Sequence, residues 1–258
     1  MVVIDLDGTL LCSDGTLSPR SGEALRGAAE AGVRIVFATA RPAAAAADIL
    51  RAGVGDFLVS SNGAVVSSWA TGRILRRTTM PAEVAAALIE ALVRSDPCVA
   101  WAVDREDDRL VSPRWPDVLA AVSTPVRCVD RLPSGPGALC LMVVGAPLER
   151  CVAVAERFGV SCTSSATGLV EFSAPGAEKH SALDWVLGHL GLGWSAVIAY
   201  GDGLNDVSML AASGVGVAVA NACEEALRVA DRVIPSNDDD GVAWDLRELT
   251  RNVAASNV

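Results

Sequence analysis

The sequence predicts an α/β protein built on a parallel sheet, with an α+β lobe inserted into it. Short apolar segments alternate with helix-length segments at both ends of the chain, as in successive βαβ units. Between about residues 80 and 175 this alternation gives way to short strand-like pieces with interspersed helices. With 258 residues, 51% of them hydrophobic, the chain is long and apolar enough for one large domain or two small ones with buried cores.

The N-terminal part is expected to contain three strands and two helices, followed by turns. The predicted strands are residues 2–5, 33–38 and 57–60, and the predicted helices are residues 19–30 and 42–53. Ser18 before Pro19 is typical of a helix N-cap with proline at the first helical position. The pair Asn62-Gly63 predicts a turn between two short β-prone runs.

The middle and C-terminal parts complete the pattern. In the inserted lobe we expect helices at residues 81–94, 117–122 and 147–158, and strands at residues 99–103, 109–111, 126–129 and 139–144. After Pro175-Gly176 the first rhythm returns, with strands at residues 196–200, 215–219 and 232–234. One helix is expected at residues 179–190, a second after Asp206 that ends at about residue 212, and a third that begins at residue 224. The acidic run at residues 238–240 is expected to be a solvated loop without a function.

Composition and charge argue against several classes of protein. The formal net charge is −10, and the basic face of a general nucleic-acid binder is not evident. Since no run of about 18 apolar residues is present, we expect no membrane span. No basic stretch precedes an apolar run near the N-terminus, so we expect no secretory signal and a cytoplasmic location. The sequence does not indicate an oligomeric state.

The cysteines and the lysine give two further clues. The seven cysteines form no CxxC pair, and in a chain of this length we expect reduced thiols. Of the 21 basic residues all but Lys179 are arginine. Because an ammonium and a guanidinium differ in shape and hydration, a single retained lysine suggests a specific role.

Carboxylates follow two of the predicted core strands. Asp5 ends the first strand, and Asp7 lies two residues further on. Asp202 follows the strand at residues 196–200, and Asp206 lies four residues further on. Ligands of open α/β sheets bind beyond the carboxyl ends of the strands, so Asp5 and Asp202 converge there if their strands are neighbours. Such crowded carboxylates repel each other, and a few carboxylates plus waters suit Mg²⁺ better than Ca²⁺.

A phosphate ester as substrate would explain the polar residues around this point. Asp5 could attack phosphorus as a nucleophile, which splits one difficult step into two. Asp7 could give a proton to the leaving group and then take one from water. Thr39 offers a hydroxyl near a helix start, where anions bind, and Lys179 offers a cation for the charge that develops in the transition state.

Four segments together resemble the motifs of the haloacid dehalogenase-like (HAD) superfamily, in the family's order. They are Asp5-Leu6-Asp7-Gly8-Thr9-Leu10, Ala38-Thr39-Ala40-Arg41-Pro42, Lys179, and Gly201-Asp202-Gly203-Leu204-Asn205-Asp206. The insertion separates the second motif from the third, which is similar to the Cof-type, type-IIB cap branch. One departure is Ala40, since related Cof-type proteins usually have glycine there, and its methyl group can change the local fit.

The resemblance implies a role for each matching residue. Asp5 would be the nucleophile and a Mg²⁺ ligand, and Asp7 would be the acid/base with its backbone carbonyl on the metal. Asp202 would be a direct metal ligand, and Asp206 would act through water or in a supporting position. The phosphate would be held by the side chains of Thr39, Lys179 and Asn205 and by the backbone N–H groups of Leu6 and Ala40.

The resemblance also implies a Rossmann-like HAD core with a separate cap. The core would comprise residues 1–79 and 176–258, and the α+β cap residues 80–175. Such a lobe can close over a site, exclude water and contact the rest of the substrate. The function expected is a Mg²⁺-dependent phosphatase for a small phosphorylated metabolite, such as a sugar phosphate, acting through an aspartyl phosphate.

Some alternatives stay open at this stage. A phosphotransferase, such as a phosphosugar mutase, would use the same cap and acid/base aspartate. A catalytically silent binding protein with the same fold would be expected to lack Asp5, Asp7 or Asp202, and this chain has all three. Arg41 could contact substrate or form a structural ion pair. The substrate itself and the residues that select it are not readable from the sequence.

Overall fold

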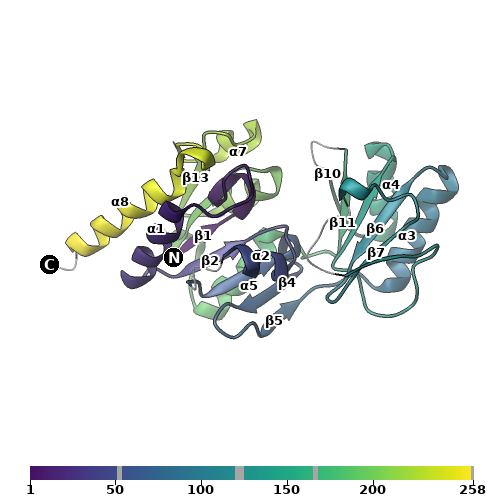
Figure 1. Ribbon diagram of the computed structural model, residues 1–258, viewed down its shortest axis with the longest axis horizontal. Coiled ribbons are helices and arrows are strands. Elements are labelled where there is room, and N and C mark those ends of the chain that lie inside the picture. The colour runs from purple at the N-terminus through teal and green to yellow at the C-terminus, as the bar shows by residue number, and fades with distance from the viewer. Residues whose placement is uncertain (51–53, 120–124, 165–167, 257–258) are drawn as a thin grey trace. The chain divides into compact units, whose positions relative to one another are not determined.

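The computed structural model describes residues 1–50, 54–119, 125–164 and 168–256, and the chain divides into two compact units (Figure 1). The first unit comprises Met1–Arg76 and Glu178–Val258, and the second comprises Arg77–Ala177. Each unit has its own sheet. Within the described ranges, no helix combines the length and the apolar character needed to cross a membrane.

The first unit is built on an eight-stranded sheet with the order β14-β13-β12-β1-β2-β3-β4-β5. Its strands are β1 (Val2–Ile4), β2 (Ile35–Ala38), β3 (Phe57–Ser60), β4 (Val65–Ser68), β5 (Ile74–Arg77), β12 (Ile198–Gly201), β13 (Val215–Val219) and β14 (Arg232–Ile234). The strands from β14 to β3 pair in parallel, whereas β4 pairs with β3 in antiparallel orientation. The predicted α/β class with a parallel sheet is therefore confirmed.

Helices cover both faces of this sheet because its central strands are apolar on both sides. The helices of the unit are α1 (Pro19–Glu30), α2 (Ala43–Ile49), α5 (Lys179–Leu190), α6 (Val207–Ala212), α7 (Glu224–Val229) and α8 (Gly241–Ser256). Along β1, Val2 and Ile4 pack with residues of α1, α2 and α8, whereas Val3 packs with residues of α5, α6 and α7. The two-sided cover buries β1 completely.

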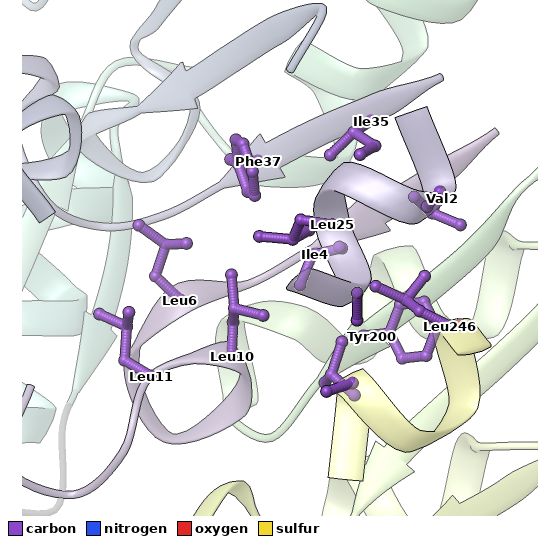
Figure 2. Packing of buried hydrophobic residues seen from close by; sticks show 14 of the residues in the cluster. Val2, Ile4, Leu6, Leu10, Leu11, Leu25, Ile35, Phe37, Tyr200 and Leu246 are labelled. Atoms are coloured by element: carbon purple, nitrogen blue, oxygen red, sulfur yellow. The ribbon is translucent and has the colours of Figure 1, made fainter. Parts of the chain in front are cut away.

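Figure 2 shows the packing on the first of these faces. Ile4 of β1 lies among Phe37 of β2, Leu25 of α1 and Leu246 of α8, all fully buried. Leu6, Leu10 and Leu11, which follow β1, belong to the same cluster. These leucines anchor the loop after β1 in the core, so its polar residues are presented from a rigid base. At about 1.5–3 kcal/mol for each buried leucine, the anchoring is strong.

The second unit carries a six-stranded sheet with the order β10-β11-β9-β6-β7-β8. Its strands are β6 (Ala100–Asp104), β7 (Arg109–Val111), β8 (Val126–Cys128), β9 (Cys140–Val144), β10 (Ser161–Ser164) and β11 (Val170–Ser173), and its helices are α3 (Ala82–Ser95) and α4 (Leu148–Phe158). Most pairs are antiparallel, and among the described strands only β7 and β8 pair in parallel. Trp115 and Met142 contribute to a separate apolar cluster in this unit.

Several elements differ from the expectations. The helix expected at residues 117–122 is a single 3₁₀ turn at Asp117–Leu119, and residues 120–122 lie outside the described ranges. The helix expected at residues 42–53 spans Ala43–Ile49, and residues 51–53 likewise lie outside them. Strands β10 and β11 and helix α8 were not expected, because β10 is polar and because α8 follows the acidic run that suggested a loop.

Candidate active site

The two strands that end in carboxylates are direct neighbours. β1 pairs with β12 in parallel, with Ile4 opposite Tyr200, and the Asp5 N–H donates to the Tyr200 carbonyl at 3.0 Å. Asp5 and Asp202 each follow the last residue of their strand, so both emerge at the carboxyl edge of the sheet. This is the edge at which open α/β sheets bind ligands.

Three aspartates form a tight cluster there. One carboxylate oxygen from each of Asp5, Asp202 and Asp206 lies within 4.8 Å of the others. Asp206 is fully buried and Asp5 is 5% exposed, whereas Asp202 is partly exposed. Buried carboxylates are expensive to leave uncompensated, so a counter-charge is required at this point.

Lys179 supplies part of that charge. Its ammonium Nζ donates to Asp5 Oδ1 at 2.5 Å and to Asp206 Oδ1 at 2.8 Å, and its side chain is fully buried. Lys179 is the first residue of α5, which packs under β1 and β3 through its apolar side chains. The only lysine of the chain is therefore placed between two of the three clustered carboxylates.

The pKa values of these groups follow from burial and from their mutual charges. Burial raises the pKa of Asp5 well above its usual value, and the charge of Asp206 raises it further, while Lys179 opposes the rise. Burial also raises the pKa of Asp202. For Lys179, burial acts to lower the pKa, but the carboxylates of Asp206 and Asp5 outweigh it and the pKa is raised. The lysine therefore stays charged.

Three contacts hold the loops of the cluster in place. Gly8 has φ +77°, and a Cβ on it would lie 2.4 Å from Asp202 Oδ2, so only glycine fits there. Thr9 Oγ1 donates to Asp202 Oδ1 at 2.7 Å. Asp206 Oδ2 accepts from the backbone N–H groups of Asp202 at 3.1 Å and Gly203 at 3.0 Å. The carboxylate of Asp206 thus orders the loop that carries Asp202.

The Asp7 carboxylate pairs with Arg41. Arg41 Nε donates to Asp7 Oδ2 at 2.7 Å, and Arg41 Nη2 donates to Asp7 Oδ1 at 2.5 Å. The Asp7 side chain is 50% exposed and that of Arg41 is 32% exposed. Of the two readings open for Arg41, the structure shows an ion pair, and its partner is the carboxylate expected to act as acid/base. The Asp7 carboxylate is not part of the three-aspartate cluster.

The residues expected to hold phosphate lie around the same edge. Thr39 follows β2 and is fully buried, and its Oγ1 accepts from the Arg41 N–H at 3.1 Å. Ala40 is the next residue and is exposed, whereas the Leu6 side chain is buried. Asn205 Nδ2 donates to Asn62 Oδ1 at 3.1 Å. These residues come from four segments that are far apart in the sequence.

Residues near the C-terminus support the loop after β1, and sequence reasoning missed them. Asn221 Nδ2 donates to the Gly8 carbonyl at 2.7 Å, and Asn237 Nδ2 donates to the Leu11 carbonyl at 2.9 Å. Asp238 accepts from the N–H and the hydroxyl of Ser13. The acidic run is therefore not a free solvated loop but holds the loop after β1. Isolated asparagines carry no local signal for such long-range contacts.

A cavity of about 600 Å³ opens beside the acid/base candidate, within the first unit. Asp7, Gly8 and Arg41 line one part of it, and Asn221 and Asn237 line another. Its lining is mostly polar or charged, so it can form hydrogen bonds with a polar molecule. The Asp7–Arg41 pair borders this cavity.

A comparison with known protein families identifies the family of this chain. The family model of haloacid dehalogenase-like hydrolases matches residues 2–118 and 149–246. The chain belongs to the haloacid dehalogenase-like hydrolases. The predicted membership of the HAD superfamily and the predicted hydrolase class are thereby confirmed, together with the HAD fold.

Two curated proteins match most of this chain. Pyridoxal phosphate phosphatase YbhA of Escherichia coli is 30% identical, over 94% of this chain and 96% of its own length. The chloroplastic endoribonuclease YBEY of Arabidopsis thaliana is 28% identical over 94% of this chain. This chain spans only 45% of the length of that relative.

Solved structures of HAD proteins superpose well on this chain. A HAD phosphatase from Bacteroides thetaiotaomicron has a TM-score of 0.83 and is 27% identical, covering 96% of this chain and 93% of its own. A HAD subclass IIB sugar phosphatase has a TM-score of 0.81 and is 21% identical, covering 96% of this chain and 98% of its own. The second likeness shows the fold alone.

Proposed function

We propose that this HAD hydrolase is a Mg²⁺-dependent phosphatase that hydrolyses a small phosphorylated metabolite through an aspartyl phosphate on Asp5. One observation carries the proposal. The buried Lys179 bridges Asp5 and Asp206 at the carboxyl edge of the sheet, with Asp202 in the same cluster. A structural salt bridge would not require a third carboxylate packed against it, whereas phosphoryl transfer uses a nucleophile, a cation and a metal site together.

The first step forms a bond between Asp5 and phosphorus. The Asp5 carboxylate attacks the phosphoryl group, the bond from phosphorus to the ester oxygen breaks, and the leaving oxygen takes a proton from Asp7. Arg41 occupies both Asp7 oxygens in the structure, so Asp7 must leave this pair before it donates. Lys179 opposes the negative charge on the transferring group.

The second step returns the enzyme to its starting state. Asp7, now ionised, takes a proton from water, and the water oxygen attacks the phosphorus of the aspartyl phosphate. The bond between Asp5 and phosphorus breaks, which regenerates the Asp5 carboxylate and releases inorganic phosphate. One aspartate thus serves as acid and then as base, as microscopic reversibility allows.

The donor set of the cluster fits a divalent hard cation. Asp5, Asp202 and Asp206 offer only oxygen ligands, which Mg²⁺ prefers, and their spacing allows a shared ion. Three carboxylates and one ammonium leave two negative charges to compensate. Asp5 and Asp202 would hold Mg²⁺ directly, with the Asp7 carbonyl, and Asp206 would support the site. When bound, Mg²⁺ would neutralise charge on a phosphoryl oxygen.

Two observations support the proposed substrate class. The relatives include a phosphatase named for pyridoxal phosphate. A polar cavity borders Asp7 and Arg41. Both observations support a small, polar phosphate monoester. We also propose that the second unit acts as the cap that selects it.

A screen tests the proposal directly. Phosphate release is measured from phosphorylated metabolites and from an aryl phosphate, with Mg²⁺ and with EDTA, and without an added phosphoryl acceptor. We expect release with Mg²⁺ and none in EDTA, and a phosphosugar mutase would instead require an acceptor. Asp5→Asn should abolish turnover because an amide is a poor nucleophile, whereas the exposed Asp184→Asn serves as a matched control. Full activity of Asp5→Asn would overturn the nucleophile assignment.

A further inference from the structure

A strained turn follows β3 at residues 61–63. Ser61 has φ 48° and Asn62 has φ 58°, and Gly63 follows with φ 110°. Within the described residues, only one other non-glycine residue, Asp240, has a positive φ. The left-handed conformation is unfavourable for residues with a side chain, so a consecutive pair persists only where its surroundings fix it.

The backbone of this turn is tied to the second motif. The Ser61 N–H donates to the Arg41 carbonyl at 2.9 Å, and the Asn62 N–H donates to the Thr39 carbonyl at 2.9 Å. Both acceptors belong to the segment after β2. The left-handed conformation thus turns two successive N–H groups toward that segment, and it directs the Asn62 side chain elsewhere.

The Asn62 side chain reaches the fourth motif. Asn62 Oδ1 accepts a hydrogen bond from Asn205 Nδ2 at 3.1 Å, across 143 residues of sequence. An amide NH₂ group has two hydrogens, so this bond uses one and fixes the direction of the other. Asn205 is held in one orientation by a residue outside the four motifs.

Gly63 lies against the backbone of Glu178 and Lys179, at the third motif. A Cβ on Gly63 would lie 2.4 Å from both the carbonyl carbon and oxygen of Glu178, and 2.9 Å from the Lys179 nitrogen. The turn therefore lies directly against the start of α5, and any side chain at residue 63 would displace the backbone from which Lys179 reaches Asp5.

We propose that the turn is a positioning element of the active site, in which Asn62 orients the Asn205 amide toward the phosphoryl group and Gly63 seats Lys179. The proposal rests on the proposed phosphatase function, because Asn205 and Lys179 have their roles there. Three of the four motif segments touch this one turn. Asn62 and Gly63 act through those residues and need not touch the substrate.

A double-mutant cycle on Asn62 and Asn205 tests the first half. Asn62→Gly keeps the left-handed turn, because glycine adopts this conformation freely, and it removes the acceptor for Asn205. The readouts are the dissociation constant of inorganic phosphate with Mg²⁺ present, measured by calorimetry, and kcat/KM on an aryl phosphate. We expect Asn62→Gly to raise the dissociation constant of phosphate and to lower kcat/KM, each by about tenfold. In the double variant of Asn62→Gly and Asn205→Ala, we expect both values to equal those of Asn205→Ala alone.

A matched pair of glycine variants tests the second half. Gly63→Ala and Gly72→Ala both place a side chain at positive φ, but a Cβ on Gly72 would meet nothing within 4 Å. We expect Gly63→Ala to lower kcat and Gly72→Ala to leave it unchanged. If Gly63→Ala fails to fold, the Asn62 cycle still decides the proposal.

The outcomes separate this inference from the proposed function. A wild-type protein that binds phosphate but releases none from any ester would refute the phosphatase, while the phosphate dissociation constants of the variants would still test the turn. An active wild-type protein with Asn62→Gly unchanged, or with strictly additive losses in the double variant, would overturn the positioning role.

Discussion

Replacing Lys179 by methionine should destabilise the first unit strongly when no metal is present. The substitution keeps an unbranched side chain of similar length but removes the ammonium that lies 2.5 Å from Asp5 and 2.8 Å from Asp206. Both carboxylates are buried, so neither can replace the lost partner with bulk water. Their charges then repel each other in a region of low polarity.

The expected magnitude follows from the burial of the pair. Removing one partner of a buried ion pair costs about 3–5 kcal/mol, because the other charge stays buried and uncompensated. Each kcal/mol lowers the melting temperature by roughly 2–4 °C for domains of about 150–250 residues. The transition of the first unit should therefore fall by roughly 6–20 °C.

Thermal unfolding followed by circular dichroism and calorimetry in EDTA at pH 8 measures this effect. Arg228→Met is a matched control, because Arg228 pairs with Glu224 on the exposed surface of α7 and such a pair contributes less than about 1 kcal/mol. Adding Asp206→Asn to Lys179→Met should recover part of the loss, since one uncompensated charge is then removed. A melting temperature of Lys179→Met within about 2 °C of the wild type would refute the reasoning.

Three further predictions follow from the geometry of the site. Mg²⁺ affinity should fall as the pH falls from 8 toward 5, because burial raises the pKa of Asp5 and Asp202 above the usual value and retained protons then compete with the metal; calorimetry in buffers of different ionisation enthalpy checks this, and a constant affinity would contradict it. Arg41→Ala should change turnover far more than the melting temperature, because its ion pair is part-exposed and contributes less than about 1 kcal/mol; an equal loss of both would favour a purely structural pair. In thiol labelling at pH 8, Cys98 should react much faster than Cys162, because Cys98 is exposed and burial raises the pKa of Cys162 to about 11; equal rates would mean that Cys162 is accessible.

The first of these three predictions also has a stability counterpart with the opposite dependence on pH. A carboxyl whose pKa is raised on folding holds its proton more tightly in the folded state. The stability that Asp5 and Asp202 contribute is therefore fully present below their unfolded pKa and is lost as the pH rises through the raised values. In EDTA, the first unit should lose this contribution on going from acidic to neutral pH, and Mg²⁺ should offset the loss.

Local sequence signals were sufficient for much of the fold. The expected strands near residues 2–5, 33–38 and 57–60 correspond to β1, β2 and β3, because short apolar runs between turn residues have few alternatives. Helix α8 and strand β10 were not expected because their local sequence gives no clear signal for a helix or a strand. Gly241 follows an acidic run, and β10 is a polar edge strand whose pairing with β11 depends on the sheet rather than on its own residues.

The sequence by itself determined which residue types stand at the ends of the core strands. Asp5, Asp202 and Lys179 could be selected because strand ends and motif spacing are local properties of the chain. Their convergence required the pairing of β1 with β12, which the sequence allowed but did not prove. The family motifs made that pairing the expected one.

Only the tertiary structure decided how these residues contact each other. The ammonium that bridges Asp5 comes from 174 residues further along the chain, and the amide that Asn62 orients comes from 143 residues further along. Arg41 could have faced substrate or a carboxylate, and the packing of the second motif against the loop after β1 selected Asp7. Such contacts depend on how buried strands and helices pack together, and no local pattern in the sequence records that packing.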